Sequence, residues 1–315
     1  MQTIIGSGGA IGVPLAEELK KYTDRIRLVS RNPVRVNATD ELFPLDVTDS
    51  RQLDKAIAGS TIVYVTIGFR YNLKVWQTVW PPFMKAVINA CISNHSKLVF
   101  FDNVYLYDKS AIPFMTEESV INPPSRKGEV RKEINEMLMH GISEGKLEAL
   151  IARAADFYGP VIRGSMLGEM VISNLLKDKN PMAFGNIDRM HTYTFTPDAG
   201  KAVALLGNTP GAFGQVWHLP TTKEKLTNRE WIGLIADKMT KKAKIRVVPE
   251  WVVNLAGIMV PLMREFPEMM YQFESDYIFD SSKFERRFNV KATSPAEGIK
   301  MSLEAISGHI ERNEI

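Results

Sequence analysis

The sequence predicts an α/β fold, a doubly wound parallel sheet followed by a smaller C-terminal domain. Two observations predict it. Short β-type runs alternate with helical patterns through the first half of the chain, and a glycine-rich loop joins the first run to the first helix. Strands that alternate with helices are typical of parallel sheets with helices on both faces.

The expected elements follow one another along the first 160 residues. We expect strands at 3–6, 25–30, 42–47, 61–68 and 97–103, with a further central strand within 147–159. Helices are expected at 11–21, 49–59, 75–94 and 127–145. The run Leu98-Val99-Phe100-Phe101 suits a strand that is covered on both faces.

After Gly159 and Pro160 the segments become shorter and richer in Met and Pro. We therefore predict a dinucleotide-binding domain at 1–160 and a mainly substrate-binding domain at 161–315. A helical pattern at 196–207 indicates that a segment near 196–215 returns to the first domain.

Composition excludes several classes of protein. Hydrophobic residues make up 45% and charged residues 24%, as in globular proteins, and a net charge of +3 is too weak a bias to indicate binding of nucleic acid or of a membrane. The one cysteine, Cys91, fits a reducing compartment and a buried place on a helix. The sequence opens directly on a strand pattern, so a cytoplasmic protein is expected.

The most apolar segment, 251–263, is shorter than the roughly 20 residues that a membrane span needs. We expect it to form a buried helix or the wall of a pocket. Methionines at 259, 263, 269 and 270 extend this apolar character, and such methionines belong to a core or to an apolar lid. The five histidines are scattered, so no metal site is expected.

The glycine loop predicts a phosphate-binding site of the Rossmann type. Glycines allow a tight turn, a close approach of the backbone to a pyrophosphate, and close packing of helix on strand. The pyrophosphate then lies at the positive end of the first helix. The residues predicted to contact it are Gly6, Ser7, Gly8, Gly9, Ala10, Ile11 and Gly12.

The end of the second strand predicts NADP rather than NAD, with NAD as the alternative. NAD enzymes usually carry an acidic residue here, and 29–33 contain none. Ser30 and Arg31 are suited to a 2′-phosphate, or Arg31 is simply an exposed turn residue. The other predicted cofactor contacts are Asp46 and Val47, beside the adenine, and Thr66, Ile67 and Gly68, towards the nicotinamide.

These motifs together resemble one family. The glycine loop, LDVTD at 45–49, VTIG at 65–68, DNVYLYD at 102–108, RAADFYGP at 153–160 and the pattern at 280–303 are similar to those of extended short-chain dehydrogenases/reductases, the NAD(P)-dependent epimerase/dehydratase family. The resemblance implies a small-molecule substrate with a carbonyl or hydroxyl group. Many members of the family are dimers, and a homodimer is one expectation here.

The catalytic apparatus that the resemblance implies is missing. The family uses a Tyr-x-x-x-Lys pair on one helical face and a Ser or Thr after the fifth strand. By spacing, Lys127 holds the tyrosine position, Arg131 the lysine position and Asn103 the Ser/Thr position. Arg131 cannot titrate, and Lys127 could serve as an acid or base only if burial and the Arg131 cation made its ammonium give up a proton more readily. Tyr105, or the nearby Tyr107, is an alternative phenol.

Three interpretations therefore remain open. The chain is an oxidoreductase or epimerase-like enzyme that uses Lys127 or Tyr105, a reductase whose proton comes from elsewhere, or a non-catalytic NADP sensor. The plain structural alternative for Lys127 and Arg131 is a solvated basic helix face.

The substrate position departs from the family as well. Many members hold a sugar-nucleotide diphosphate with an arginine seven residues before the aspartate of the returning helix, here Asp198. Counting back gives His191, with Arg189 nearby. We interpret His191 as a structural histidine, which weakens the case for a sugar-nucleotide substrate.

Overall fold

A computed structural model describes residues 1–311 of the chain, so the last four residues of the predicted second domain lie outside the described part. The chain forms two compact units, each built from several segments. The first unit comprises Met1–Leu106, Pro123–Ala154 and Ala199–Leu219. The second comprises Tyr107–Asn122, Ala155–Asp198 and the chain from Pro220 onwards.

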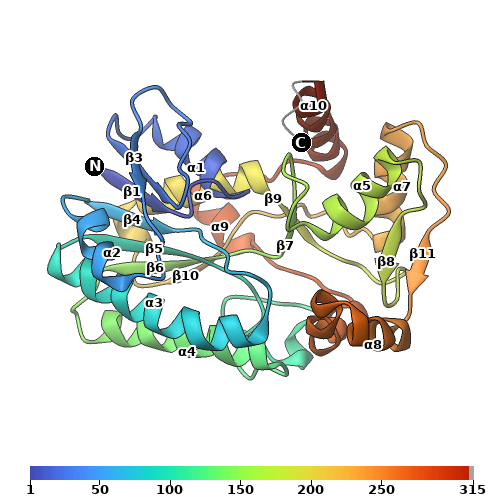
Figure 1. Ribbon diagram of the computed structural model, residues 1–315, viewed down its shortest axis with the longest axis horizontal. Helices are drawn as coiled ribbons and strands as arrows, with labels where there is room; N and C mark the ends of the chain where they lie inside the picture. Colours follow the sequence, from blue (N-terminus) through green and yellow to red (C-terminus); the bar gives the residue numbers. More distant parts are fainter. Residues whose placement is uncertain (312–315) are drawn as a thin grey trace. The chain divides into compact units, whose positions relative to one another are not determined.

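The first unit is built on a sheet of seven parallel strands, in the order β10-β6-β5-β4-β1-β2-β3 (Figure 1). Its centre is apolar because β1, β4 and β6 are buried along their whole length. The strand bounds are β1 (Gln2–Ile5), β2 (Ile26–Ser30), β3 (Glu41–Pro44), β4 (Ile62–Val65), β5 (Lys97–Asp102), β6 (Ala149–Arg153) and β10 (Val216–His218).

Helices cover both faces of this sheet, as the sequence predicts. On one face α2, α3 and α4 lie side by side, and on the other α6 packs against α1 (Figure 1). That second contact is close, because a Cβ at Gly200 would lie 2.8 Å from backbone atoms of Pro14 and Leu15. The helix bounds are α1 (Gly12–Leu19), α2 (Ser50–Ile57), α3 (Leu73–Ser93), α4 (Arg126–Ser143) and α6 (Thr196–Gly207).

Cys91 is buried in α3, as expected, and burial raises the pKa of its thiol to about 12.

The second unit contains two small parallel sheets and several short helices. β7 (Asp156–Tyr158) pairs with β9 (Tyr193–Phe195), and β8 (Met182–Phe184) pairs with β11 (Arg246–Val248). A π-helical turn, η2, spans Leu167–Ile172. The remaining helices are α5 (Ser173–Leu176), α7 (Asn228–Lys238), α8 (Glu250–Met259), α9 (Ser282–Phe288) and α10 (Pro295–Glu311), with short 3-10 turns at Lys109–Ala111, Pro261–Glu265 and Pro267–Phe273.

Three expected elements differ from the structure. The strand expected within 147–159 is split, because β6 ends at Arg153 and β7 joins the second unit. The strand expected at 42–47 ends at Pro44, which leaves Asp46 and Val47 in the following turn. The apolar segment 251–263 is not simply buried: Val253 is, but Trp251 is 67% exposed. None of the helices within 1–311 combines the length and the hydropathy that a bilayer crossing demands.

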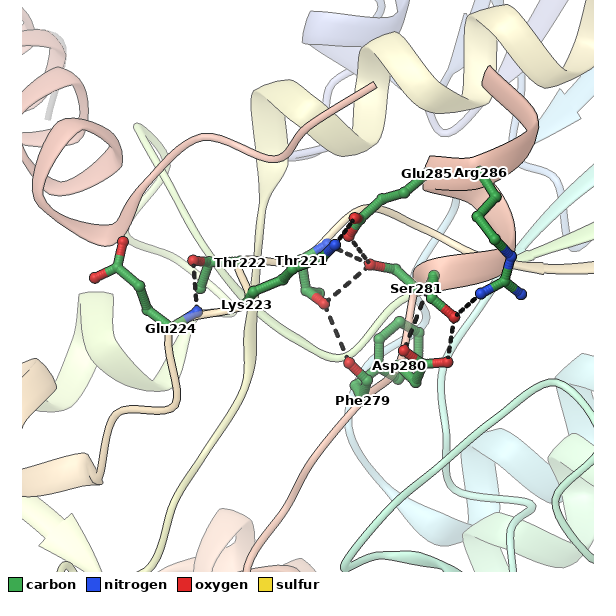
Figure 2. Close-up of polar contacts among 10 residues, drawn as sticks. Thr221, Thr222, Lys223, Glu224, Phe279, Asp280, Ser281, Glu285 and Arg286 are labelled. Carbon is green, nitrogen blue, oxygen red and sulfur yellow. Dashed lines mark hydrogen bonds and ion pairs between the residues drawn. The ribbon is translucent and has the colours of Figure 1, made fainter. Parts of the chain in front are cut away.

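The closing pattern of the sequence forms a polar junction inside the second unit. Figure 2 shows Ser281, at the start of α9, between Thr221 and Glu285. Its buried Oγ accepts a hydrogen bond from the Thr221 backbone N at 3.1 Å and donates to the Glu285 carboxylate at 3.2 Å. The segment that follows β10 is therefore tied to the start of α9.

We expect Ser281→Ala to lower the free energy of unfolding by about 1–3 kcal/mol, because it leaves the buried Thr221 N–H without an acceptor. Ser282→Ala is the matched control. Ser282 is half-buried, and among the described residues its hydroxyl bonds to Asp280 and Arg286, so about 0.5 kcal/mol or less is expected. Urea denaturation of both variants checks this, and equal losses would contradict the role given to Ser281.

Candidate functional site

The glycine loop contains two glycines that the fold itself requires. Gly6 has a φ of 99°, and a Cβ there would lie 2.6 Å from backbone atoms of Ile67. A Cβ at Gly12 would lie 2.5 Å from the Gly6 carbonyl oxygen. Side chains at these positions would force β1 away from the end of β4 and from α1. Gly6 and Gly12 therefore set the shape of the loop.

The other two glycines are exposed, and the fold does not require them. A Cβ at Gly8 would meet nothing within 4 Å, and one at Gly9 would meet only the Gly6 oxygen at 3.5 Å. Ser7 follows Gly6 directly. Its Oγ is buried and has no hydrogen-bond partner within residues 1–311. Among the residues that the structure describes, no side chain caps the N-terminus of α1. These features fit a pyrophosphate that approaches the backbone at the positive end of α1.

The loop lies at the point where the strand order of the sheet reverses. β1 is between β2 and β4, and the chain runs outward from it in both directions. Thr66, directly after β4, donates its backbone N–H to the Ile5 carbonyl at 2.9 Å. The structure therefore brings the segment 66–68 beside the glycine loop, at the switch point where doubly wound sheets bind dinucleotides.

The ends of β2 and β3 carry the residues predicted to contact the adenosine part. Ser30 is half-buried, and Arg31 is exposed, with no hydrogen bond or salt bridge to another of the described residues. Asp46 is exposed, and hydrogen bonds from the Thr48 N–H and hydroxyl, with a smaller contribution from Arg31, lower the pKa of its carboxyl. Val47 is buried in the core and can offer only its backbone.

The N-terminus of α4 is pressed against the segment after β5. Ser125 caps the helix by accepting from the Gly128 N–H at 3.0 Å. Gly128 permits a very close approach, since a Cβ there would lie 2.3 Å from the Tyr105 carbonyl oxygen. This contact fixes the first turn of α4, and with it Lys127, beside the segment 103–105.

Lys127 and Arg131 are buried, so the interpretation as a solvated basic face is wrong. The Lys127 ammonium lies 4.7 Å from the centre of the Tyr71 ring, a cation–π contact. Asn103 is half-buried, its Oδ1 accepts from the Tyr105 N–H at 3.1 Å, and its Nδ2 makes no hydrogen bond within the described chain. Tyr107 is completely buried and belongs to the second unit.

Arg131 belongs to a buried charge cluster. Its Nε lies 3.1 Å from Oδ1 of Asp102, and Arg153 approaches the other oxygen of that carboxylate at 3.2 Å. Asn135 bridges the cluster, since it donates to Asp102 at 2.8 Å and accepts from Arg153 at 2.6 Å. Burial lowers the pKa of Arg131, and Asp102 opposes that effect. The guanidinium is thus fixed within the cluster.

Aromatic rings surround the two cations, a feature that sequence reasoning missed. The Arg131 guanidinium lies 4.5 Å from the Trp80 ring, and the Tyr105 ring stacks on Trp76 at 6.0 Å. Trp76 and Trp80 both come from α3. The signal in the sequence was the density of aromatic residues between 69 and 80. The cations therefore lie in a largely apolar environment.

His191 is a buried structural histidine of the second unit. Its Nε2 lies 2.9 Å from Oδ2 of Asp156, and its ring stacks on Tyr277 at 4.2 Å. Arg189 is exposed. His191 is therefore engaged within the second unit by Asp156 and Tyr277.

A family model of NAD(P)H-binding proteins matches the part of the chain that carries the glycine loop. The family model described as NAD(P)H-binding matches residues 6–123, which include the glycine loop, Ser30, Arg31 and Asn103. No curated protein sequence matches the chain significantly.

Solved structures resemble the whole chain at low sequence identity. The UDP-glucose 4-epimerase of Thermotoga maritima has a TM-score of 0.80 and 16% identity, with 98% of this chain and 100% of that chain covered. The UDP-glucuronic acid 4-epimerase of Bacillus cereus, in complex with UDP-glucuronic acid and NAD, has a TM-score of 0.77 and 18% identity over 98% and 99% of the two chains. The dTDP-glucose 4,6-dehydratase of Bacillus anthracis, in complex with NAD, has a TM-score of 0.79 and 14% identity over 98% and 97%.

The predicted resemblance to extended short-chain dehydrogenases/reductases is therefore confirmed for the fold. The predicted cofactor class, NAD(P), is that of the matching family model.

The different roles of Gly12, in the fold, and of Gly9, in cofactor binding, can be tested by substitution. We expect Gly12→Ala to lower the free energy of unfolding by about 1–3 kcal/mol, because its Cβ meets backbone atoms at 2.5 Å. Gly9→Ala should leave stability within about 1 kcal/mol of the parent but weaken dinucleotide binding by about tenfold. Thermal denaturation and NADPH fluorescence titration measure the two effects. Unchanged binding by the folded Gly9→Ala protein would refute the loop as the pyrophosphate site.

Proposed function

We propose that the chain is an NADP-dependent oxidoreductase that interconverts a carbonyl and a hydroxyl group on a small molecule, with Lys127 as its proton donor and acceptor. One observation supports this most directly. The only buried lysine among the described residues stands at the first turn of α4, packed against the segment that carries Asn103. A buried amine at the carboxyl edge of the sheet is suited to chemistry rather than to solvation.

Residues of the first unit would hold the cofactor. The glycine loop takes the pyrophosphate, Ser30 and Arg31 take the 2′-phosphate, and Asp46 accepts from the adenine amino group. The backbone of Val47 lies beside the adenine, and Thr66, Ile67 and Gly68 lead towards the nicotinamide. When bound, the nicotinamide supplies or accepts the hydride.

The protein side chains handle the proton and the substrate oxygen. In reduction, the Nδ2 of Asn103 donates a hydrogen bond to the carbonyl oxygen as it gains negative charge. The Lys127 ammonium then gives that oxygen a proton, so that the carbonyl carbon gains a hydride and the oxygen a proton. In oxidation the neutral amine takes the proton back. Tyr105 is the alternative donor, since its phenol is on the same segment as Asn103.

The substrate differs in class from the sugar nucleotides named for the solved structures. An anionic diphosphate needs a cation, and the family's arginine is here His191, which is bound to Asp156 and stacked on Tyr277. We therefore expect an uncharged carbonyl or hydroxyl compound.

The rival function is that of an NADP sensor without turnover. It is favoured by the engagement of Arg131 with Asp102, which removes the cation that the family places on the nicotinamide ribose. Binding of NADPH without consumption of it, across a broad panel of uncharged carbonyl compounds, would favour the sensor and contradict the oxidoreductase.

The preference for NADP predicts an asymmetric effect of Arg31→Ala. Loss of a charge-assisted bond to the 2′-phosphate should weaken NADPH binding by about tenfold or more and leave NADH binding nearly unchanged. Exposed Arg51 on α2 is the control, and Arg51→Ala should alter neither affinity. Equal losses for the two dinucleotides on Arg31→Ala would exclude the 2′-phosphate role.

The proton role predicts that Lys127→Met abolishes turnover while cofactor binding survives. Methionine has nearly the same shape and no proton to transfer, so kcat should fall by about a hundredfold or more. Lys132→Met, on the next turn of the same helix, should retain the activity. Steady-state oxidation of NADPH with the best substrate of the panel measures this. If the Lys127→Met enzyme is active, Lys127 is not the proton donor, and that role would belong to Tyr105.

A further inference from the structure

The small net charge of the chain conceals a strongly basic segment. Residues 238–249 contain five basic and no acidic residues: Lys238, Lys241, Lys242, Lys244 and Arg246. Lys241 is paired with Asp178. Lys242, Lys244 and Arg246 are exposed, and they alternate with Ala243 and Ile245, which pack against the core of the second unit. The alternation indicates that the three cations project outward together.

The next element, α8, presents apolar side chains to solvent. Val253 anchors the helix, since it is completely buried among Phe184, Met270 and Phe273. Trp251 and Leu255 are 67% and 60% exposed. They are four residues apart and therefore share one face of the helix. The other tryptophans of the chain are all buried, so this exposure is a particular feature of α8.

The basic segment and the apolar face are continuous. Only Pro249 separates the end of β11 from the start of α8, and Figure 1 shows the strand leading directly into the helix. Val247, in β11, and Val260, directly after α8, are also exposed. An open depression of about 430 Å³ lies beside α8 and is lined by Asn254, Gly257, Met263, Arg264 and Pro267. The surface of β11 and α8 thus combines cations, exposed apolar side chains and a depression lined in part by an arginine.

We propose that β11 and α8 form a docking surface for an anionic lipid bilayer. Tryptophan and leucine on one face of a short helix enter the boundary between headgroups and acyl chains, and lysines and arginines bind anionic headgroups. The charges favour a bilayer over a second copy of the chain, because a two-fold contact would bring the three cations near their own counterparts. The helix lies on the surface and does not cross it. The expectation of no membrane partner was based on net charge and on the length of the apolar segment, and neither describes such a surface contact.

Vesicles of phosphatidylcholine with phosphatidylserine test the proposal, and vesicles of phosphatidylcholine alone are the comparison. We expect the protein to sediment with the anionic vesicles and to be released by high salt. Trp251 supplies an internal reporter, because the other tryptophans are already buried. Its fluorescence should shift to shorter wavelength with the anionic vesicles only.

Matched variants separate this surface from non-specific adsorption. Neutralising three cations, in Lys242→Gln, Lys244→Gln, Arg246→Gln, should weaken binding on the order of a hundredfold. The same change at exposed lysines elsewhere, Lys55→Gln, Lys85→Gln, Lys291→Gln, should have little effect. Leu255→Ser should weaken binding about tenfold, whereas Leu176→Ser, at the exposed end of α5, should not.

Three results would overturn the proposal. The first is a failure of the folded parent protein to bind anionic vesicles, and the second is equal binding by all of the variants. The third is a concentration-dependent dimer in sedimentation velocity that Trp251→Ser converts to a monomer, which would assign the face to a second copy of the chain. Circular dichroism of each variant confirms that it is folded.

Discussion

The structure of the candidate site depends on one buried carboxylate. Asp102, at the end of β5, lies between the guanidinium groups of Arg131 and Arg153 and is completely buried. Leaving either cation unpaired in this apolar environment would cost several kcal/mol. The cluster therefore holds α4, β5 and β6 in one arrangement. Because α4 is held at Arg131, its first turn, which carries Lys127, lies against the backbone of Tyr105.

This arrangement separates two roles that the resembling family combines on one helix. The position of the family's lysine has become structural, since Arg131 is bound to Asp102 and surrounded by aromatic rings. At the position that corresponds by spacing to the family's tyrosine, the chain has the buried amine of Lys127, to which we assign the proton transfer. In our account the chemistry therefore depends on one side chain of α4, and the other stabilises the helix that carries it.

The sequence predicted the features that local patterns determine. Glycine spacing at 6, 9 and 12 located the loop, and alternating strand and helix patterns located the sheet. The contact between Asp102 and Arg131 could not be predicted, because it joins residues far apart in the sequence and Arg131 was open to interpretation as part of a solvated basic helix face. The split between β6 and β7 was missed, since 147–159 reads as one central strand that ends in a loop. The exposed face of α8 was missed for a similar reason: hydropathy does not show which side of a helix is covered.

The unfolding free energy of Arg131→Met, measured together with its affinity for NADPH, tests the central claim most directly. If Arg131 serves the buried cluster, the substitution should lower stability by about 3 kcal/mol, because Asp102 loses one of its two cationic partners, and NADPH affinity should change by less than about threefold. If instead stability is unchanged and NADPH affinity falls by about tenfold or more, Arg131 binds the cofactor as the family's lysine does, and the separation of roles on α4 is wrong.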